Sequence, residues 1–260
     1  MLSAAVTPLV PTTAIPTGLA TLDDIGVGGV PSGRLTVLAG ERSAGTSALL
    51  FTMATHNALQ DRPTVFLSGQ DSAASVQDKF LAAVAGVNID RPATLGPGRI
   101  LRIGAAADAL RDRPLWLASG LWEARCPAIR KILACPADQV RRGLLLVDGV
   151  RLLGSGPEAD LLHDLEGFAR ELDIAVVASV HLKSRFRAGD TSAALRELRG
   201  MLASTDAAAV VLVHRPDRDG DVLGRRDEVD LIPAAGWPGT ATATVRFEPH
   251  YHRLVDLPNT

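Results

Sequence analysis

The sequence contains little lysine and few aromatic residues. Only three of its 27 basic residues are lysines, and they stand at Lys79, Lys131 and Lys183. Any chemistry that requires a lysine ammonium therefore has three candidate positions in 260 residues. The chain has six Phe, three Trp and one Tyr. This scarcity argues against a protein that stacks successive single-stranded bases on aromatic side chains.

Cysteine, long apolar runs and net charge are scarce as well. Cys126 and Cys135 lie nine residues apart in a helical pattern without a CxxC motif, so we expect buried free thiols rather than a zinc site. No apolar run approaches the roughly 20 residues that span a bilayer. The N-terminal residues lack the basic segment of a signal peptide. We therefore expect a cytoplasmic protein with no membrane partner, and its net charge of −2 means that any polyanion site is local.

Short, nearly continuous apolar runs alternate with helical patterns along the chain. Such runs are typical of strands buried on both faces of a parallel sheet, and the alternation predicts a doubly wound α/β fold. The predicted strands are Arg34–Gly40, Pro63–Gly69, Pro114–Gly120, Gly143–Asp148, Ala175–Leu182 and Ala207–His214. Three further short strands, Val229–Ile232, Ala241–Phe247 and His252–Leu257, predict an antiparallel C-terminal extension of this sheet.

Helical patterns fill the intervals between these strands. The clearest is Pro157–Asp173, whose start carries the capping-box pattern Ser155-Gly156-Pro157-Glu158. No composition shift or linker divides the chain after its Pro/Thr-rich start. We therefore expect a flexible leader, residues 1–15, followed by a single domain, residues 16–260.

The loop after the first predicted strand has the spacing of a phosphate-binding P-loop, G-x-x-x-x-G-K-[ST]. It reads Gly40-Glu41-Arg42-Ser43-Ala44-Gly45-Thr46-Ser47, so Thr46 stands where the lysine belongs. Backbone N–H groups and the start of the next helix can hold phosphate without that lysine. Thr46 cannot supply the ammonium that reaches the β- and γ-phosphates, and the planar guanidinium of Arg42 is an imperfect substitute. The candidate nucleotide-binding residues are Gly40, Arg42, Ser43, Gly45, Thr46 and Ser47.

Two polar residues are candidates for binding Mg²⁺. The hydroxyl of Ser47 occupies the position of the metal-binding P-loop residue, and Asp148 ends an apolar strand as a Walker B aspartate does. Each feature is also compatible with a purely structural turn, in a Gly-rich loop or before Gly149. Their occurrence together favours a P-loop fold, in which these two residues would bind Mg²⁺ if the metal is bound.

In this order, the motifs resemble the RecA-like ATPase domain of DnaB-type replicative helicases, with KaiC- and RadA-like proteins as relatives. The lead-in Pro16–Asp23 resembles that family's TG-x-x-x-LD segment. Leu195-Arg196-Glu197, followed by Thr205-Asp206-Ala207 and by Arg215 after a strand, resembles its LRE…DAD…strand-Arg block. Gly239-Thr240 and Phe247 resemble its closing hairpin. The resemblance implies a RecA-like fold, single-stranded DNA as a partner, and a ring-shaped homo- or hetero-oligomer.

The resemblance also implies losses at chemically important positions. Gln70 stands at the position of the family's catalytic glutamate, and His181 at that of its sensor glutamine. Ile232 and Ala234 stand where a lysine and an arginine finger reach a neighbouring subunit's γ-phosphate. Because an arginine finger alone contributes about 10³–10⁵ in rate, we expect a pseudo-ATPase unless a partner supplies the missing groups.

Lys183, Arg185 and Arg187 alternate after the predicted strand Ala175–Leu182, so an extended loop would point them the same way. In DnaB-like proteins, loops of this region line the central channel and contact the DNA backbone, which requires only positive charge. A solvated surface loop is the alternative interpretation. Two histidines, His250 and His252, would share a face of a terminal strand, and we interpret them as packing residues because no third metal ligand is evident.

These observations favour a degenerate RecA-like protein that binds ATP and Mg²⁺ weakly or not at all, hydrolyses nucleotide poorly, and acts as an accessory or regulatory DNA-associated protein. One alternative is an active ATP-dependent DNA helicase that uses Arg42 and residues of a partner. The other is a protein-interaction scaffold that binds neither ATP nor DNA.

Overall fold

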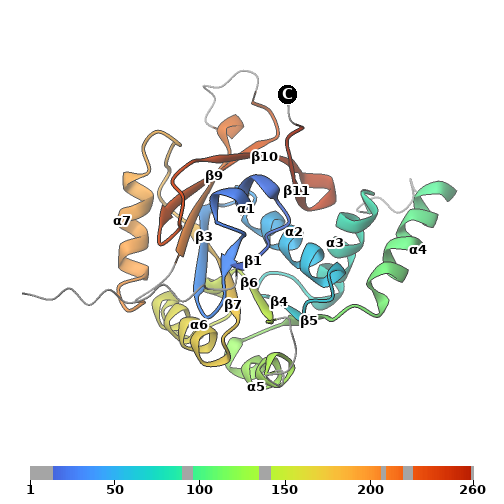
Figure 1. Cartoon of the computed structure of the whole chain (residues 1–260), viewed down its shortest axis with the longest axis horizontal. Helices are drawn as coiled ribbons and strands as arrows, with labels where there is room; N and C mark the ends of the chain where they lie inside the picture. Colours follow the sequence, from blue (N-terminus) through green and yellow to red (C-terminus); the bar gives the residue numbers. More distant parts are fainter. Residues whose placement is uncertain (1–13, 90–95, 135–141, 206–208, 219–224, 259–260) are drawn as a thin grey trace, which may run out of the picture.

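A sheet of nine strands runs through the described part of the chain, which comprises residues 14–89, 96–134, 142–205, 209–218 and 225–258 of the computed structural model (Figure 1). Its strand order is β11-β10-β9-β8-β3-β7-β6-β4-β5. The parallel strands are β3 (Leu35–Glu41), β4 (Thr64–Ser68), β5 (Leu115–Ser119), β6 (Leu144–Asp148), β7 (Ala175–Leu182) and β8 (Ala209–His214). The antiparallel strands are β9 (Glu228–Ala235), β10 (Ala243–Glu248) and β11 (Arg253–Asp256). The predicted mostly parallel sheet with an antiparallel C-terminal extension is confirmed.

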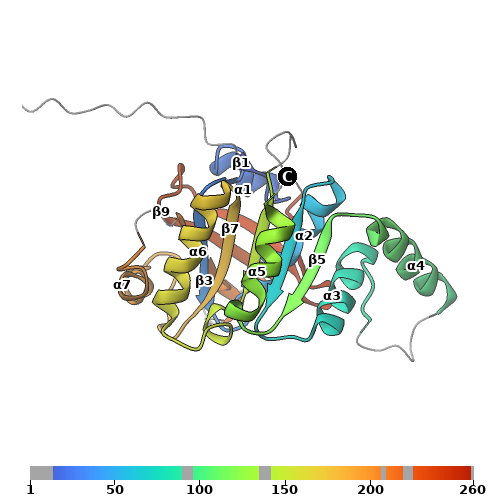
Figure 2. The same ribbon diagram turned by 90° about the horizontal axis from the view of Figure 1, so that it is seen from below.

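Helices cover both faces of this sheet because its central strands are apolar on both sides. On one face, α2 (Thr46–Leu59) and α3 (Ala73–Ala85) contribute Phe51 and Phe80 to the first hydrophobic cluster. On the other face, α5 (Trp122–Leu133), α6 (Glu158–Leu172) and α7 (Ser192–Met201) close the second cluster around Phe168. Helix α4 (Pro97–Arg111) lies beyond α3 and projects away from the sheet (Figure 2).

The starts of these helices depend on local contacts. Helix α2 begins at Thr46, within the P-loop motif, and α3 begins at Ala73, where the Ser72 hydroxyl accepts a hydrogen bond from the backbone N–H of Ser75. The predicted capping box of α6 does not form. Its N-terminal residue Pro157 provides no side-chain cap, and the Ser155 hydroxyl donates to Glu123 instead.

The beginning of the described chain is built into the fold. Strand β1 (Ala14–Ile15) pairs with β2 (Val30–Pro31), and the side chain of Ile15 is fully buried. Residues 14 and 15 of the segment assigned to the leader thus belong to the described fold. Helix α1 (Ala20–Ile25) follows, and its first backbone N–H donates to the Asp256 carboxylate of β11.

The terminal hairpin differs from its prediction at the histidines. A 3-10 helix, Pro249–Tyr251, separates β10 from β11, and His252 has the left-handed φ of 49° that ends this turn. His250 and His252 therefore do not share a strand face, and that expectation is wrong. Within the described residues, two other 3-10 helices lie at Val150–Leu152 and Pro216–Arg218.

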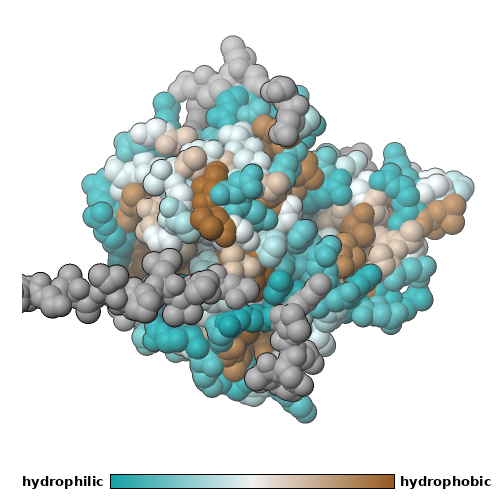
Figure 3. All heavy atoms as spheres, in the orientation of Figure 1, coloured by the Kyte–Doolittle hydropathy of each residue, from teal (hydrophilic) through white to brown (hydrophobic). Residues whose placement is uncertain are grey.

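The visible surface mixes hydrophilic and apolar residues, with the apolar ones in separate patches (Figure 3). Among the described residues, no helix combines the length and the apolar character that crossing a membrane requires. Cys126 lies half-buried in α5 as a free thiol, whereas Cys135 lies outside the described residues.

Candidate nucleotide-binding site

Four segments that carry the candidate residues meet at one edge of the sheet. The P-loop follows β3, Gln70 follows β4, Asp148 ends β6, and His181 lies at the end of β7. These strands are parallel, and the pairing aligns Gly40 with His181. In open parallel sheets, ligands bind in the crevice at the carboxyl ends of the strands. The topology therefore brings together residues that are more than 100 positions apart in the sequence.

The P-loop has the backbone conformation that its glycines predict. Ser43 and Gly45 have left-handed φ values of 64° and 112°, and the Ala44 N–H donates to the carbonyl of Glu41 at 3.0 Å. A Cβ atom at Gly40 would lie 2.6 Å from the carbonyl oxygen of Val213, so only glycine fits there. Helix α2 starts directly after Gly45 without a side-chain cap. Its first N–H groups are thus oriented as in an anion-binding helix terminus.

A cavity of about 300 Å³ opens in front of this helix start. It is lined by Arg42, Ser43, Gly45, Thr46, Ser47, Ala48, Phe51, Gln70, Lys79, His181, Phe247 and His252. The cavity is thus lined by five of the six candidate nucleotide-binding residues, by Gln70 at the catalytic position and by His181 at the sensor position. Gly40, the sixth, lies beneath the loop, where its missing side chain allows the close approach of β8.

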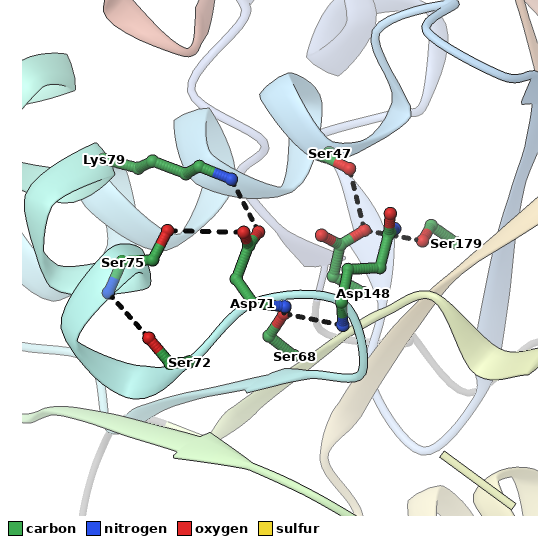
Figure 4. A network of polar contacts seen from close by, with 9 residues as sticks. Ser47, Ser68, Asp71, Ser72, Ser75, Lys79, Asp148 and Ser179 are labelled. Atoms are coloured by element: carbon green, nitrogen blue, oxygen red, sulfur yellow. Dashed lines mark hydrogen bonds and ion pairs between the residues drawn. The ribbon is translucent and has the colours of Figure 1, made fainter. Parts of the chain in front are cut away.

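Asp148 forms the polar centre beneath the cavity. Its Oδ1 accepts hydrogen bonds from the hydroxyls of Ser47 and Ser179, each at 2.9 Å, and the Gly149 N–H donates to Ser179 at 2.8 Å (Figure 4). Only 1% of the Asp148 surface is exposed. Burial raises the pKa of Asp148, and the hydrogen bonds from Ser179 and Ser47 act in the opposite direction.

These groups fit a hard divalent cation. Mg²⁺ prefers oxygen ligands and typically takes one or two protein groups together with phosphate oxygens and waters. A buried carboxylate that shares a hydrogen bond with a P-loop hydroxyl is such a donor set. Within the described residues, no group of three or more His, Cys, Asp or Glu side chains forms a site for another metal.

Thr46 does not replace the missing lysine. Its side chain is 2% exposed, and its methyl group packs against Gly40 beneath the loop. The position therefore contributes packing and a backbone N–H to the site, but no positive charge.

Gln70 and His181 approach the cavity from two neighbouring sides. The Gln70 N–H donates to the Ser68 hydroxyl, and its side chain packs against Gly149, next to the metal-site aspartate. Burial lowers the pKa of His181, the Asp148 carboxylate opposes this shift, and the Arg42 guanidinium adds to it. The lowered pKa favours the neutral form of the His181 imidazole.

An ion pair that the sequence reasoning missed lies at the rim of this cavity. The Lys79 Nζ of α3 contacts the Asp71 Oδ2 at 2.6 Å, and the Ser75 hydroxyl donates to the other carboxylate oxygen (Figure 4). Asp71 is also close enough to Asp148 for its charge to raise the pKa of that residue further. The available signal was the position of Asp71 directly after Gln70; Lys79 follows eight residues later, within α3.

The positions of the arginine finger lie elsewhere. Ile232 and Ala234 belong to β9, which pairs with β8 and β10, and Ile232 is 9% exposed. Neither residue carries a charge. The neighbouring charged residue of this strand, Asp230, is tied to Arg225 through both carboxylate oxygens, at 3.0 and 2.5 Å.

The three basic candidates for DNA binding are exposed but do not form one extended strand. The chain bends at Lys183–Ser184, buries Phe186 against His214, and turns between Arg187 and Asp190. Lys183 lines a cavity of about 780 Å³ that also contains His181, whereas Arg185 lies 4.0 Å from the Glu41 carboxylate at the P-loop. The three basic side chains thus do not alternate along an extended loop, because the loop that carries them is folded.

Glu197, from the LRE motif, holds this loop in place. Its carboxylate accepts the backbone N–H groups of Lys183 and Ser184 at 3.0 and 2.9 Å. Burial acts to raise the pKa of Glu197, but these hydrogen bonds outweigh that effect and lower it. Of the DAD-like motif, Thr205 is described, and Asp206 and Ala207 lie outside the described residues.

The sequence is similar to several curated proteins. It is 28% identical to the replicative DNA helicase DnaB of Leifsonia xyli subsp. xyli over 94% of this chain, and 31% identical to that of Treponema pallidum over 93%. It is 26% identical to the DNA repair protein RadA of Mycobacterium tuberculosis over 80% of this chain. The chain covers 56% of each DnaB protein and 43% of RadA, so it spans about half the length of these relatives.

Solved structures share the fold. The ATPase domain of G40P superimposes with a TM-score of 0.77 at 18% identity, covering 95% of this chain and 92% of that domain. A DnaB-like replicative helicase, described with its interactions with primase, superimposes with a TM-score of 0.76 at 18% identity, covering 95% of this chain and 64% of its own. The family model of the DnaB-like helicase C-terminal domain matches residues 14–256. The chain therefore belongs to the DnaB-like helicase C-terminal domain family, as its P-loop, Walker B strand and closing hairpin predicted.

Proposed function

We propose that this chain binds a nucleoside triphosphate with Mg²⁺ at the P-loop cavity, hydrolyses it very slowly, and acts as an accessory or regulatory protein on single-stranded DNA. One observation carries the proposal. The backbone cradle and the Ser47–Asp148 pair are intact, while a buried threonine occupies the position of the P-loop lysine and Gln70 that of the catalytic glutamate.

The groups that nucleotide binding requires are present in this chain. The positive end of an uncapped 14-residue helix faces the cavity, and its N–H groups can hold phosphate oxygens regardless of the side chain at position 46. Ser47 and Asp148 would hold Mg²⁺, which neutralises charge on the phosphates that it bridges. The guanidinium of Arg42 lines the cavity and adds its positive charge to that of the helix terminus.

Hydrolysis requires parts that are missing from this chain. The Gln70 amide can orient a water molecule, but it cannot accept the proton of the attacking water as a carboxylate does. Ile232 and Ala234 provide no charge for a neighbouring site. General-base and arginine-finger contributions are worth about 10²–10⁴ and about 10³–10⁵ in rate, so turnover fast enough to drive translocation is not expected.

The association with DNA rests on the basic loop. Lys183, Arg185 and Arg187 are exposed, and the loop is anchored at its start by Glu197 and in its middle by buried Phe186. A positioned basic loop can contact phosphates without reading sequence. The expected ring assembly and cytoplasmic location stay predictions.

The test is a titration of the purified protein with Mg·ATP, with a phosphate-release assay run in parallel. We expect saturable binding without release above background. Ser47→Ala should weaken binding about tenfold when Mg²⁺ is present and leave binding in EDTA unchanged, because it removes one Mg²⁺ ligand. Ser155→Ala, which removes a hydroxyl of the opposite helix layer, is the matched control.

Two other outcomes would overturn the proposal. Phosphate release that Asp148→Ala abolishes would identify an active ATPase completed by Arg42 or by a neighbouring copy. No detectable binding of ATP with or without Mg²⁺ would favour a protein-interaction scaffold instead.

A further inference from the structure

Lys79 is the lysine that the fold brings to the nucleotide cavity. It lies in the middle of α3, which packs beside α2, and it lines the cavity together with Gly45 and Ser47. The other two lysines do not reach this place. Lys131 is exposed on α5, on the opposite face of the sheet, and Lys183 lines a different cavity.

The ammonium of Lys79 is held by a single carboxylate. Its Nζ contacts Asp71 Oδ2 at 2.6 Å, and both side chains are about one quarter exposed, at 26% and 24%. Figure 4 shows Lys79 reaching from α3 to Asp71 in the loop between β4 and α3, with Asp148 and Ser179 on the other side of Asp71. A partly exposed lysine on a four-carbon stem can change partners without unfolding its helix.

Asp71 is fixed by contacts that do not involve Lys79. Its backbone N–H donates to the Ser68 hydroxyl at 3.0 Å, and its Oδ1 accepts from the Ser75 hydroxyl at 3.3 Å. If the lysine moves away, the carboxylate keeps Ser75 and solvent as partners. Departure of Lys79 from Asp71 therefore leaves no buried charge without a partner.

The position of the pair matches the end of a bound triphosphate. The P-loop N–H groups would hold the phosphates of a bound nucleotide, and Ser47 and Asp148 would hold Mg²⁺, which would neutralise charge on the outer phosphates. The Asp71 carboxylate lies beside that of Asp148 (Figure 4), and Lys79 lines the same cavity as Ser47. A terminal phosphate that shares Mg²⁺ with Ser47 and Asp148 would therefore lie on the Lys79 side of the cavity.

We propose that Lys79 replaces the missing P-loop lysine as the phosphate-binding cation, exchanging its ion pair with Asp71 for the terminal phosphate of a bound nucleoside triphosphate. This inference rests on the proposed function, because it requires that the cavity binds nucleotide. In this proposal the phosphate-binding lysine belongs to α3, whereas the P-loop lysine position, Thr46, is at the start of α2. It also makes Asp71 a competitor that holds Lys79 while the cavity is empty.

Substitutions of this pair should change affinity in opposite directions. Lys79→Met should weaken binding of a nonhydrolysable ATP analogue about tenfold, because a charge-assisted hydrogen bond to phosphate is lost. It should weaken ADP binding less, since ADP lacks the terminal phosphate. Asp71→Asn should tighten binding of the analogue several-fold, because Lys79 no longer has to leave a carboxylate and a negative charge near the phosphates is removed.

The decisive measurement is calorimetric titration of wild type, both single variants and the double variant with the analogue and with ADP. The gain from Asp71→Asn should be smaller in the Lys79→Met background. Lys79→Arg, which keeps the charge, should recover part of the lost affinity. Lys131→Met is the matched control, and thermal melting of each variant verifies that it folds.

The outcomes separate this inference from the proposed function. If wild type binds the analogue and Lys79→Met binds it within twofold of wild type, the inference is overturned while the proposed function stands. Equal losses for the analogue and ADP would overturn the assignment to the terminal phosphate. If wild type binds neither ligand, the proposed function fails and the inference fails with it.

Discussion

The hydroxyl of Ser47, at the start of α2, donates a hydrogen bond to the carboxylate of Asp148, at the end of β6, over 2.9 Å. The two residues are 101 positions apart and stand on elements that meet through the packing of α2 on the central sheet. The same carboxylate oxygen accepts from Ser179. A buried acidic group is thus kept close to the P-loop by two neutral hydroxyl donors.

This arrangement predicts that Asp148→Asn stabilises the empty protein. Burial raises the pKa of Asp148 above its ordinary value, so its ionised form costs free energy of folding at neutral pH. Replacing a buried charge with a neutral group of the same shape should raise the free energy of unfolding by about 1 kcal/mol at pH 7.5. Urea denaturation of both proteins without Mg²⁺ measures this difference.

The pH dependence checks the cause. As the pH falls below the raised pKa of folded Asp148, the folded wild type binds a proton that the unfolded chain does not, and the penalty shrinks until it is lost below the ordinary pKa of the unfolded residue. The stability advantage of Asp148→Asn should therefore shrink on acidification and be full above that pKa. An advantage that stays constant with pH would contradict the electrostatic explanation. In return, the variant should lose the Mg²⁺ dependence of nucleotide binding.

Gln70→Glu should increase phosphate release. Glutamate has the shape of glutamine and places a carboxylate in the cavity beside Gly149, where it can act as general base. We expect a rise of at least about tenfold over the wild-type rate under single-turnover conditions, within the range of general-base catalysis. Gln60→Glu, the same change just after α2, is the control. An unchanged rate would show that the missing arginine finger limits hydrolysis instead.

Replacing Lys183, Arg185 and Arg187 with glutamine should reduce binding to single-stranded DNA. Each phosphate contact contributes about 0.7 to the slope of log affinity against log salt for single strands, so the slope should fall by about 2. Fluorescence anisotropy with an oligonucleotide at several salt concentrations gives this slope. The triple variant Arg99→Gln, Lys131→Gln and Arg226→Gln removes the same charge from exposed positions elsewhere. Equal slopes for the two variants would move the DNA site away from this loop.

Arg225→Met should destabilise the C-terminal extension. Arg225 donates to both oxygens of Asp230, whose side chain is 3% exposed, and Thr244 donates to the same carboxylate at 2.8 Å. Loss of the guanidinium leaves a buried carboxylate with one remaining hydroxyl donor, which should cost about 2 kcal/mol of unfolding free energy. The exposed neighbour Arg226→Met should change it by less than about 0.5 kcal/mol. Chemical denaturation distinguishes the two.

Local patterns were sufficient to predict the strands and the P-loop. Runs such as Leu144–Val147 are apolar throughout because their strands are buried on both faces, so continuous hydrophobicity revealed them. The predicted Ser155 cap does not form because the Ser155 hydroxyl donates a hydrogen bond to Glu123, which is distant in sequence. The sequence pattern predicted that the histidines of the terminal hairpin lie in one strand. A 3-10 turn of three residues is too short to change the alternation of apolar and polar residues from which strands are predicted. Boundaries depend on such competing contacts, which a linear pattern does not contain.

The sequence by itself determined the family, the fold class, the order of the phosphate and metal motifs, and the absence of a lysine from the P-loop. These features depend on residue types at short spacings and on apolar runs, which act locally. Only the tertiary structure decided that Lys79 and Asp71 meet at the nucleotide cavity and that Ser47 bonds to Asp148. Those contacts arise because parallel strands end at one edge of the sheet and α2 packs against α3, which places distant residues within hydrogen-bonding distance.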